Sequence, residues 1–467
     1  MEQLTFDRVG ERMYREKLEN GLTVCVFPKP EFQKGYAFFA TNYGGMDVRF
    51  CLDGVWTDSP AGVAHYLEHK MFDTKEGNAL QDLAANGASP NAFTSSAITG
   101  YYFESTEKFE ENLRILLSFV SVPWFTQESV DKEQGIIGQE IGMIEDDPEW
   151  KLFFLNGGFT VEGGIVFRNC AELFNLNGMK DMTAIGGDLV FENCPKIATD
   201  WGAGNCLSQI VSVAGSVESI SHITADTLYA CHKAFYDPAN MVLCVAGNVD
   251  PERICEIARE ILPREGRGDI PRDYGGAEGP QAAAHRKELR MEVSTPIFQL
   301  GYKGDALPQG EERLRRQLVG ELALEVLLGS SSPLYAKLYR EGLINRNFSY
   351  GCESYPGCFF LCAGGESKDP EAVRKAVADE AARIGRDGVD GKLWERVKKG
   401  VYGNKVRGLN SFENLCVGQA QAFFAGYDFL DFAGLFASIT KEEAEHLIAD
   451  WVTEERTALS VVRPKEG

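Results

Sequence analysis

The feature that most constrains the 467-residue sequence is a His-x-x-Glu-His stretch at residues 65–69. Ser59-Pro60 just before it predicts a helix start, because a possible N-cap oxygen is followed by a proline at the first helical position. Residues four apart lie on one face of a helix, so His65 and His69 can bind one metal ion. Glu68 lies beside them, free to hold a water molecule. The alternative is two surface histidines, but two of only six histidines at this spacing favour the metal.

A catalytic zinc usually has three protein ligands and one open position, so a third ligand is expected on another element. The stretch from Thr126 to Asp146 has a helical pattern, and Pro148 would end it. Glu133 and Glu140 are two helical turns apart in this stretch and therefore share a face. Both are candidates, although most helical glutamates lie on a solvated face.

His65-x-x-Glu68-His69, followed by Glu133 and Glu140, resembles the inverted zinc motif of the pitrilysin/insulinase family of peptidases, the inverzincins. Three further segments resemble that family: Gly87–Thr94, Phe235–Met241 and Val245–Asp250. The resemblance is greatest to a bacterial, YmfH-like branch. It implies an α+β fold of two homologous halves, each with an antiparallel-rich sheet covered by helices, as in mitochondrial-processing-peptidase-like proteins.

The resemblance also implies a role for each motif residue. His65, His69 and Glu140 would bind one zinc ion per chain, and Glu133 would orient a liganding histidine. Zinc would lower the pKa of a water molecule toward about 7 and polarise the scissile carbonyl. Glu68 would be the general base that takes the proton of this water and passes it to the leaving amine.

Four residues are candidates for substrate binding by the same resemblance. Asn91 and Ala92 lie on an expected edge strand beside the metal, where a peptide could add as a further strand. The alternative for them is a turn asparagine and a core alanine. Arg340 and Tyr350 resemble a substrate-binding Arg…Tyr pair, but they are ten residues apart, whereas seven is usual in the family. Their alternative is an exposed arginine and a strand tyrosine.

The length allows two or three domains, and the sequence pattern divides the chain into three segments. Residues 1–262 are the expected zinc-binding half. Residues 263–284, rich in Gly, Pro and charge, are an expected linker. Residues 285–467 are the expected second half, without a metal motif. An acid-capped helix followed by a buried strand occurs from Ile223 and again 216 residues later, which supports two similar halves.

A block at residues 156–212 interrupts the family pattern. Gly163–Cys170 recurs as Gly187–Cys194, an offset of 24 residues. This period and its Val-Phe-x-Asn-Cys pattern predict a short insert that resembles leucine-rich or receptor-L-type β-solenoid rungs. Two or three rungs barely bury a core alone, so the insert would lean on its host. It could narrow the cleft, bind a partner or be a graft, and these alternatives stay open.

Composition bears on partners and location. The net charge of −22 argues against nucleic acid and acidic membranes as partners. No run approaches the roughly eighteen apolar residues of a membrane span, and the N-terminus lacks a signal pattern, so we expect a cytoplasmic protein. The twelve cysteines form no Cys-x-x-Cys pair, which indicates buried thiols in a reducing compartment.

The sequence therefore predicts a zinc metalloendopeptidase, a hydrolase that cleaves short unfolded peptides between its two halves. One alternative is a catalytically weak or inactive peptidase-like subunit, in which the insert docks a partner. Another is a maturation factor that serves one cellular protein. The presence of His65, Glu68, His69 and Glu140 favours the enzyme, because a vestigial site usually loses one of them. A related subunit could be needed, in a homo- or heterodimer.

Overall fold

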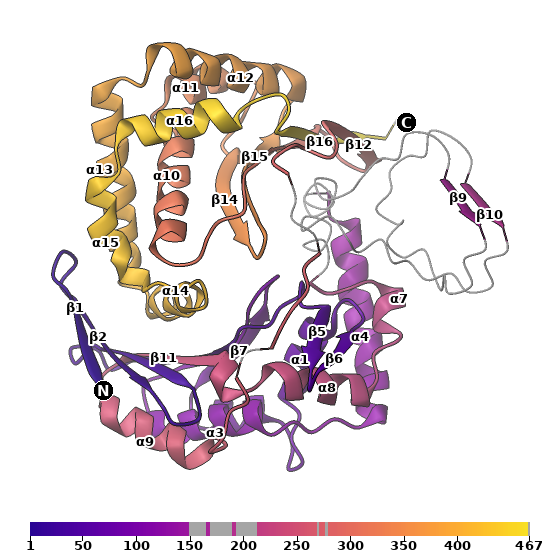
Figure 1. Ribbon diagram of the computed structural model, residues 1–467, viewed down its shortest axis with the longest axis vertical. Helices are drawn as coiled ribbons and strands as arrows, with labels where there is room; N and C mark the ends of the chain where they lie inside the picture. The colour runs from indigo at the N-terminus through magenta and orange to yellow at the C-terminus, as the bar shows by residue number, and fades with distance from the viewer. Residues whose placement is uncertain (149–164, 169–188, 193–212, 269, 276–278, 466–467) are drawn as a thin grey trace.

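The structure is a computed structural model that describes residues 1–148, 165–168, 189–192, 213–268, 270–275 and 279–465. Two halves, each a sheet with its own helices, face one another (Figure 1). None of the helices in these ranges combines the length and apolar character that a membrane crossing requires.

The N-terminal half is built on a seven-stranded sheet in the order β1-β2-β3-β11-β4-β8-β7. Its strands are β1 Glu2–Phe6, β2 Glu11–Lys17, β3 Thr23–Pro28, β4 Gly35–Thr41, β7 Ser89–Thr94, β8 Thr99–Ser105 and β11 Met241–Gly247. β11 is the central strand, and all of its residues are buried, as its continuous apolar run predicts. It pairs in parallel with β3 and antiparallel with β4.

One face of this sheet is covered by helices of the same half. The helices are α1 Val63–Met71, α2 Ala79–Ala85, α3 Phe109–Ser121, α4 Gln127–Asp146, α7 Val217–Ile220, α8 Ala225–Phe235 and α9 Pro251–Ile261. The short hairpin β5 Arg49–Leu52 and β6 Val55–Asp58 precedes α1, and the 3-10 turn η2 Pro238–Asn240 precedes β11. Ala37 and Phe39 of β4 point into this core.

The C-terminal half has a five-stranded sheet in the order β12-β16-β13-β15-β14. Its strands are β12 Arg286–Met291, β13 Ile297–Lys303, β14 Ser349–Tyr355, β15 Cys358–Glu366 and β16 Thr457–Pro464. Its helices are α10 Glu311–Leu328, α11 Pro333–Arg340, α12 Pro370–Asp387, α13 Gly391–Gly408, α14 Phe412–Phe424, α15 Phe432–Leu435 and α16 Lys441–Trp451, with 3-10 turns η3 Phe429–Asp431 and η4 Phe436–Ser438.

Helix α14 joins the halves. It follows α13 in the chain but packs on β11 and β4, on the sheet face opposite α1 (Figure 1). Because side chains alternate along a strand, Phe38 and Ala40 of β4 enter the core that contains Phe412 and Cys416. The two halves therefore share one hydrophobic core.

The two sheets repeat one topology. β3-β11-β4-β8-β7 and β12-β16-β13-β15-β14 have the same order, with one parallel pair followed by three antiparallel pairs. α8 and α16 begin 216 residues apart and precede β11 and β16. The predicted α+β fold of two similar halves is therefore confirmed, whereas the exact domain boundaries stay a prediction.

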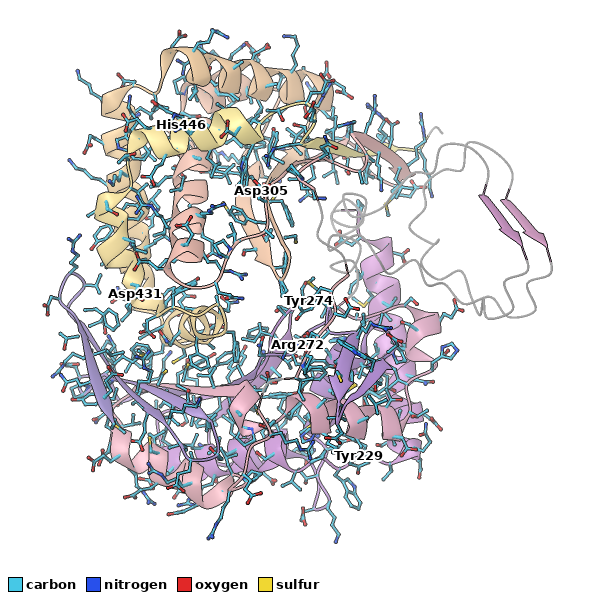
Figure 2. All side chains as sticks on the ribbon, viewed as in Figure 1. Tyr229, Arg272, Tyr274, Asp305, Asp431 and His446 are labelled. Carbon is cyan, nitrogen blue, oxygen red and sulfur yellow. The ribbon has the colours of Figure 1, made fainter. Side chains whose placement is uncertain are left out.

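The expected linker contains residues that bind the N-terminal half. Arg272 forms an ion pair with the buried Asp47, at 3.1 Å between Nε and Oδ1. The hydroxyl of Tyr274 donates a hydrogen bond of 2.7 Å to the same oxygen. Figure 2 labels both side chains, Arg272 and Tyr274. Residues of the expected linker thus contact the N-terminal half directly.

Only two short strands of the predicted insert are among the described residues. β9 Ile165–Arg168 and β10 Leu189–Glu192 pair in parallel, with Ile165 opposite Leu189. This register equals the 24-residue offset in the sequence. The other residues predicted to form rungs lie outside the described ranges, so the solenoid-like insert stays a prediction.

We predict that His232 of α8 makes stability depend on pH. Burial lowers its pKa to about 4, its Nε2 donates to the carbonyl of Val120 at 3.0 Å, and its ring stacks on Tyr236. In the unfolded chain, the pKa of His232 has its ordinary value of about 6.5, so as the pH falls the unfolded chain binds a proton before the folded chain does. The contribution of neutral, buried His232 to the free energy of unfolding is present above about pH 6.5, and roughly 2 kcal/mol of this free energy is lost between pH 7 and pH 5.

The measurement is chemical denaturation of wild type and His232→Gln at both pH values. The variant should lose less unfolding free energy than wild type over this interval. The exposed His446, changed to Gln, is the matched control and should behave like wild type. Equal pH dependence in all three proteins would contradict the assignment.

Candidate metal centre

The helix α1 carries the His-x-x-Glu-His stretch, but it begins later than predicted. Ser59-Pro60 does not cap it: Gly62 is the N-cap, with φ of 95° and no side-chain hydrogen bond. A Cβ on Gly62 would lie 2.5 Å from the carbonyl oxygen of Ala214. The start of α1 is therefore set by a close approach of two backbone segments that only glycine permits.

Helix α4 forms over the predicted residues and packs on α1. Thr126 is its N-cap and forms a capping box with Ser129. The hydroxyl of Tyr66 on α1 donates a hydrogen bond to the carbonyl of Val130 on α4. Leu67 of α1 and Ile137 of α4 are fully buried in the same core. These contacts fix the rotation of one helix against the other.

The three expected ligands come together. Nε2 of His65 lies 3.7 Å and Nε2 of His69 lies 3.5 Å from Oε2 of Glu140. The ligand atoms of all three residues lie within 4.8 Å of one another. In a tetrahedral site with bonds of about 2.0–2.1 Å, ligand atoms are about 3.3 Å apart. Two imidazoles and a carboxylate at this separation fit a zinc ion with one open position.

Glu133 holds the ring of His69 from the other side. Its Oε1 lies 3.1 Å from Nδ1 of His69, which leaves Nε2 of the same ring facing Glu140. This hydrogen bond is the main cause that lowers the pKa of Glu133, and Lys70 adds to it. Burial lowers the pKa of His69, but the hydrogen bond to Glu133 and the charges of Glu140 and Glu68 outweigh burial and raise it.

His65 is neutral at neutral pH, as a metal ligand must be. Burial lowers its pKa to about 4, and the neighbouring His69 lowers it further. Its Nδ1 is buried and has no hydrogen-bond partner among the described residues. Unlike His69, His65 is therefore not oriented by a hydrogen bond at its Nδ1.

Glu68 is held by the adjacent edge strand. Its carboxylate is hydrogen-bonded to Thr94, the last residue of β7. Burial raises the pKa of Glu68, while Thr94 and the charge of His69 oppose this shift. The sequence does not predict this role of Thr94, because nothing in the spacing of the motif shows which strand residue reaches Glu68.

The strand β7 is the outer strand of its sheet and contacts α1, as expected. Asn91 is exposed, and its Oδ1 accepts a hydrogen bond of 2.9 Å from the backbone N–H of Ala92. The Asn91 side chain thus occupies this N–H. The role of both residues in substrate binding stays a prediction.

Arg340 and Tyr350 are placed in the C-terminal half. Arg340 is exposed at the last position of α11. Tyr350 lies on β14, and its hydroxyl donates a hydrogen bond of 2.6 Å to Glu325. Among the described residues, no hydrogen bond joins Arg340 to Tyr350. Their assignment as a substrate-binding pair stays a prediction.

Comparisons with known proteins show which family the chain belongs to. Residues 56–155 match the insulinase family, peptidase family M16, and residues 222–401 match the peptidase M16 inactive domain. The chain is 33% identical over 467 residues to the uncharacterized zinc protease YmfH of Bacillus subtilis (strain 168), and the alignment covers 99% of each protein. The chain belongs to the insulinase family, peptidase family M16.

Solved structures share the fold. The crystal structure of an M16-like peptidase from Alicyclobacillus acidocaldarius has a TM-score of 0.83 and 28% identity, and covers 97% of this chain and 99% of that one. A protease from Helicobacter pylori has a TM-score of 0.70, at 14% identity, over 97% of this chain and 100% of that one. The second likeness concerns the fold alone.

We predict that Glu133→Gln lowers the pKa of His69 in protein prepared without metal. The substitution removes the charge and the carboxylate acceptor that raise this pKa, so His69 loses its proton at a lower pH. Histidine NMR titration measures the change. Glu128→Gln, in the exposed first turn of the same helix, is the matched control. An unchanged His69 titration in Glu133→Gln would contradict the contact.

Proposed function

We propose that the protein is a zinc-dependent endopeptidase that hydrolyses short unfolded peptides between its two halves. The observation that carries this proposal is the convergence of His65, His69 and Glu140 within 4.8 Å, with Glu68 on the same helix as the two histidines. The similarity to zinc proteases of the same family supports it.

Each residue of the centre has a part in the proposal. His65, His69 and Glu140 would hold the metal, and Glu133 would fix the tautomer of His69. A bound zinc ion supplies a Lewis acid that acidifies a water molecule and polarises the scissile carbonyl. Glu68 takes the proton of the attacking water and delivers it to the leaving amine. Its raised pKa suits a group that must both accept and release a proton.

The substrate would bind as an additional strand on β7. This strand has no neighbour on its outer side among the described strands. A peptide could take the place of the Asn91 side chain at the N–H of Ala92 and gain a backbone hydrogen bond. Arg340 and Tyr350 would then act from the second half, or from a related subunit in a homo- or heterodimer.

The expected location of the protein is the cytoplasm.

The first test compares zinc content and cleavage of a quenched peptide library in wild type and His69→Ala. We expect about one zinc per chain with cleavage in wild type, and loss of both in the variant. His446→Ala, on the exposed side of α16, is the control and should match wild type. Zinc without cleavage in wild type would favour a peptidase-like subunit or maturation factor. Absence of zinc would contradict the metal centre.

The second test removes the base alone. Glu68→Gln keeps the shape of the side chain but cannot accept a proton, so cleavage should fall by about 10²–10⁴-fold while zinc content stays the same. Steady-state cleavage and metal analysis of the same sample provide the readouts. Cleavage within a few-fold of wild type would exclude Glu68 as the general base.

A further inference from the structure

The C-terminal half has a pocket at the place that corresponds to the metal centre. In the first half, the centre lies where α1 and α4 meet beside the outer strand β7. In the second half, α10 and α13 meet beside the outer strand β14. Because the two sheets share one topology, these are equivalent positions. The pocket there has a volume of about 380 Å³, within the usual range of ligand sites.

The residues of this pocket follow the spacing of the metal centre with different chemistry. Glu321 and Glu325 on α10 are four residues apart, as His65 and His69 are. Tyr350 follows Glu325 by 25 residues, just as Thr94 follows His69. Leu324 stands where the first half has Glu68, so this pocket has no counterpart of the general base.

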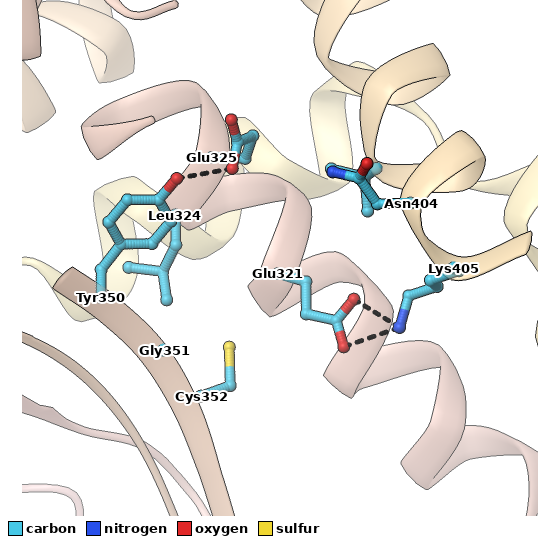
Figure 3. Close-up of a pocket in the computed structure, with 9 residues that line it drawn as sticks. Glu321, Leu324, Glu325, Tyr350, Gly351, Cys352, Asn404 and Lys405 are labelled. Atoms are coloured by element: carbon cyan, nitrogen blue, oxygen red, sulfur yellow. Dashed lines mark hydrogen bonds and ion pairs between the residues drawn. The ribbon is translucent and has the colours of Figure 1, made fainter. Parts of the chain in front are cut away.

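An ammonium group supplies the positive charge in this pocket. Lys405 of α13 lies 2.9 Å from Oε1 and 2.7 Å from Oε2 of Glu321 (Figure 3). Glu325 instead accepts a hydrogen bond from the hydroxyl of Tyr350, at 2.6 Å. The side chain of Asn404 lies at the rim and makes no hydrogen bond among the described residues. The ion pair with Lys405 thus joins α13 to α10.

The charge balance determines which ligand fits. Two carboxylates and one ammonium line the pocket, and the ammonium is already paired with Glu321. Among the described residues, the hydrogen bond to the Glu325 carboxylate comes from the neutral hydroxyl of Tyr350. A cationic ligand group would complete this arrangement, whereas an anion would meet an excess of negative charge.

The outer strand β14 can supply backbone hydrogen bonds to a peptide. Among the described strands it pairs with β15 alone, and both Tyr350 and Cys352 point from it into the pocket. A peptide that adds to β14 would place alternate side chains toward α10. We propose that this pocket binds a lysine or arginine side chain of an extended peptide lying along β14. The inference rests on the proposed function in that it gives the peptide substrate a basic residue.

The test measures binding, in the full-length Glu68→Gln chain, of a blocked five-residue peptide with one central arginine. The comparison peptide has citrulline, a neutral analogue, at that position. Isothermal titration should show at least tenfold tighter binding of the arginine peptide. Blocked arginine amide lacks the flanking backbone and should bind at least tenfold more weakly than the peptide. Equal binding of the arginine and citrulline peptides, or no binding, would overturn the proposal, and equal binding of the amide would exclude the strand addition.

Two substitutions with opposite effects assign the pocket. Glu325→Gln should weaken arginine-peptide binding about tenfold and leave citrulline-peptide binding unchanged. Lys405→Met removes a positive charge, frees Glu321 and should strengthen arginine-peptide binding. Glu312→Gln, an exposed position on the same helix, is the control. If Glu325→Gln matched this control, or Lys405→Met did not strengthen binding, the pocket assignment would be wrong.

This binding assay does not depend on hydrolysis. If the zinc centre failed to cleave peptides, the affinities would still report on the pocket. Conversely, the wild-type chain could cleave peptides in a zinc-dependent manner while the binding assay shows no preference for the arginine peptide. That result would contradict the pocket proposal and leave the proposed function intact.

Discussion

The contact between α1 and α4 is the interaction on which the candidate centre depends. α1 supplies both imidazoles and α4 supplies the carboxylates of Glu133 and Glu140, so neither helix forms the site alone. The hydroxyl of Tyr66 and the buried side chains of Leu67 and Ile137 keep the two helices in register. A small rotation of α4 would move Glu133 and Glu140 together, because they lie on one face two turns apart. Packing in the core thereby determines the geometry of the chemistry.

The two halves carry different side chains on one arrangement of helices and outer strand. Where the first half brings imidazoles and carboxylates together, the second has Glu321, Glu325 and Lys405. The ion pair in the second half bridges two helices as a metal would in the first. Helix α14 and the ion pair of Arg15 with Asp428, at 3.0 Å, hold the halves together. The metal centre and the pocket of the second half rest on two different cores, and α14 packs in the one that both halves share.

Local patterns were enough to predict much of this structure. Helix periodicity alone predicts that His65 and His69, four residues apart, share one face of a helix. It also predicts that Glu133 and Glu140, seven residues apart, share a face. The 216-residue repeat predicted the two similar halves. The start of α1 could not be predicted, because it depends on the close approach of the Ala214 backbone to Gly62, and Ala214 lies far along the chain. The bond from Glu68 to Thr94 and the pocket around Glu325 likewise depend on contacts between separate elements, and their shared spacing has meaning only once the common topology of the two halves is known.

X-ray absorption spectroscopy at the zinc edge on the purified full-length protein would test the central claim most directly. We expect one zinc per chain, bound by two imidazole nitrogens and carboxylate or water oxygens at about 2.0–2.2 Å, and loss of this zinc signal in His69→Ala. Sulfur ligands at about 2.3 Å, or a spectrum that His69→Ala leaves unchanged, would show that the metal lies elsewhere. Either result would contradict the assignment of His65, His69 and Glu140 as the ligands.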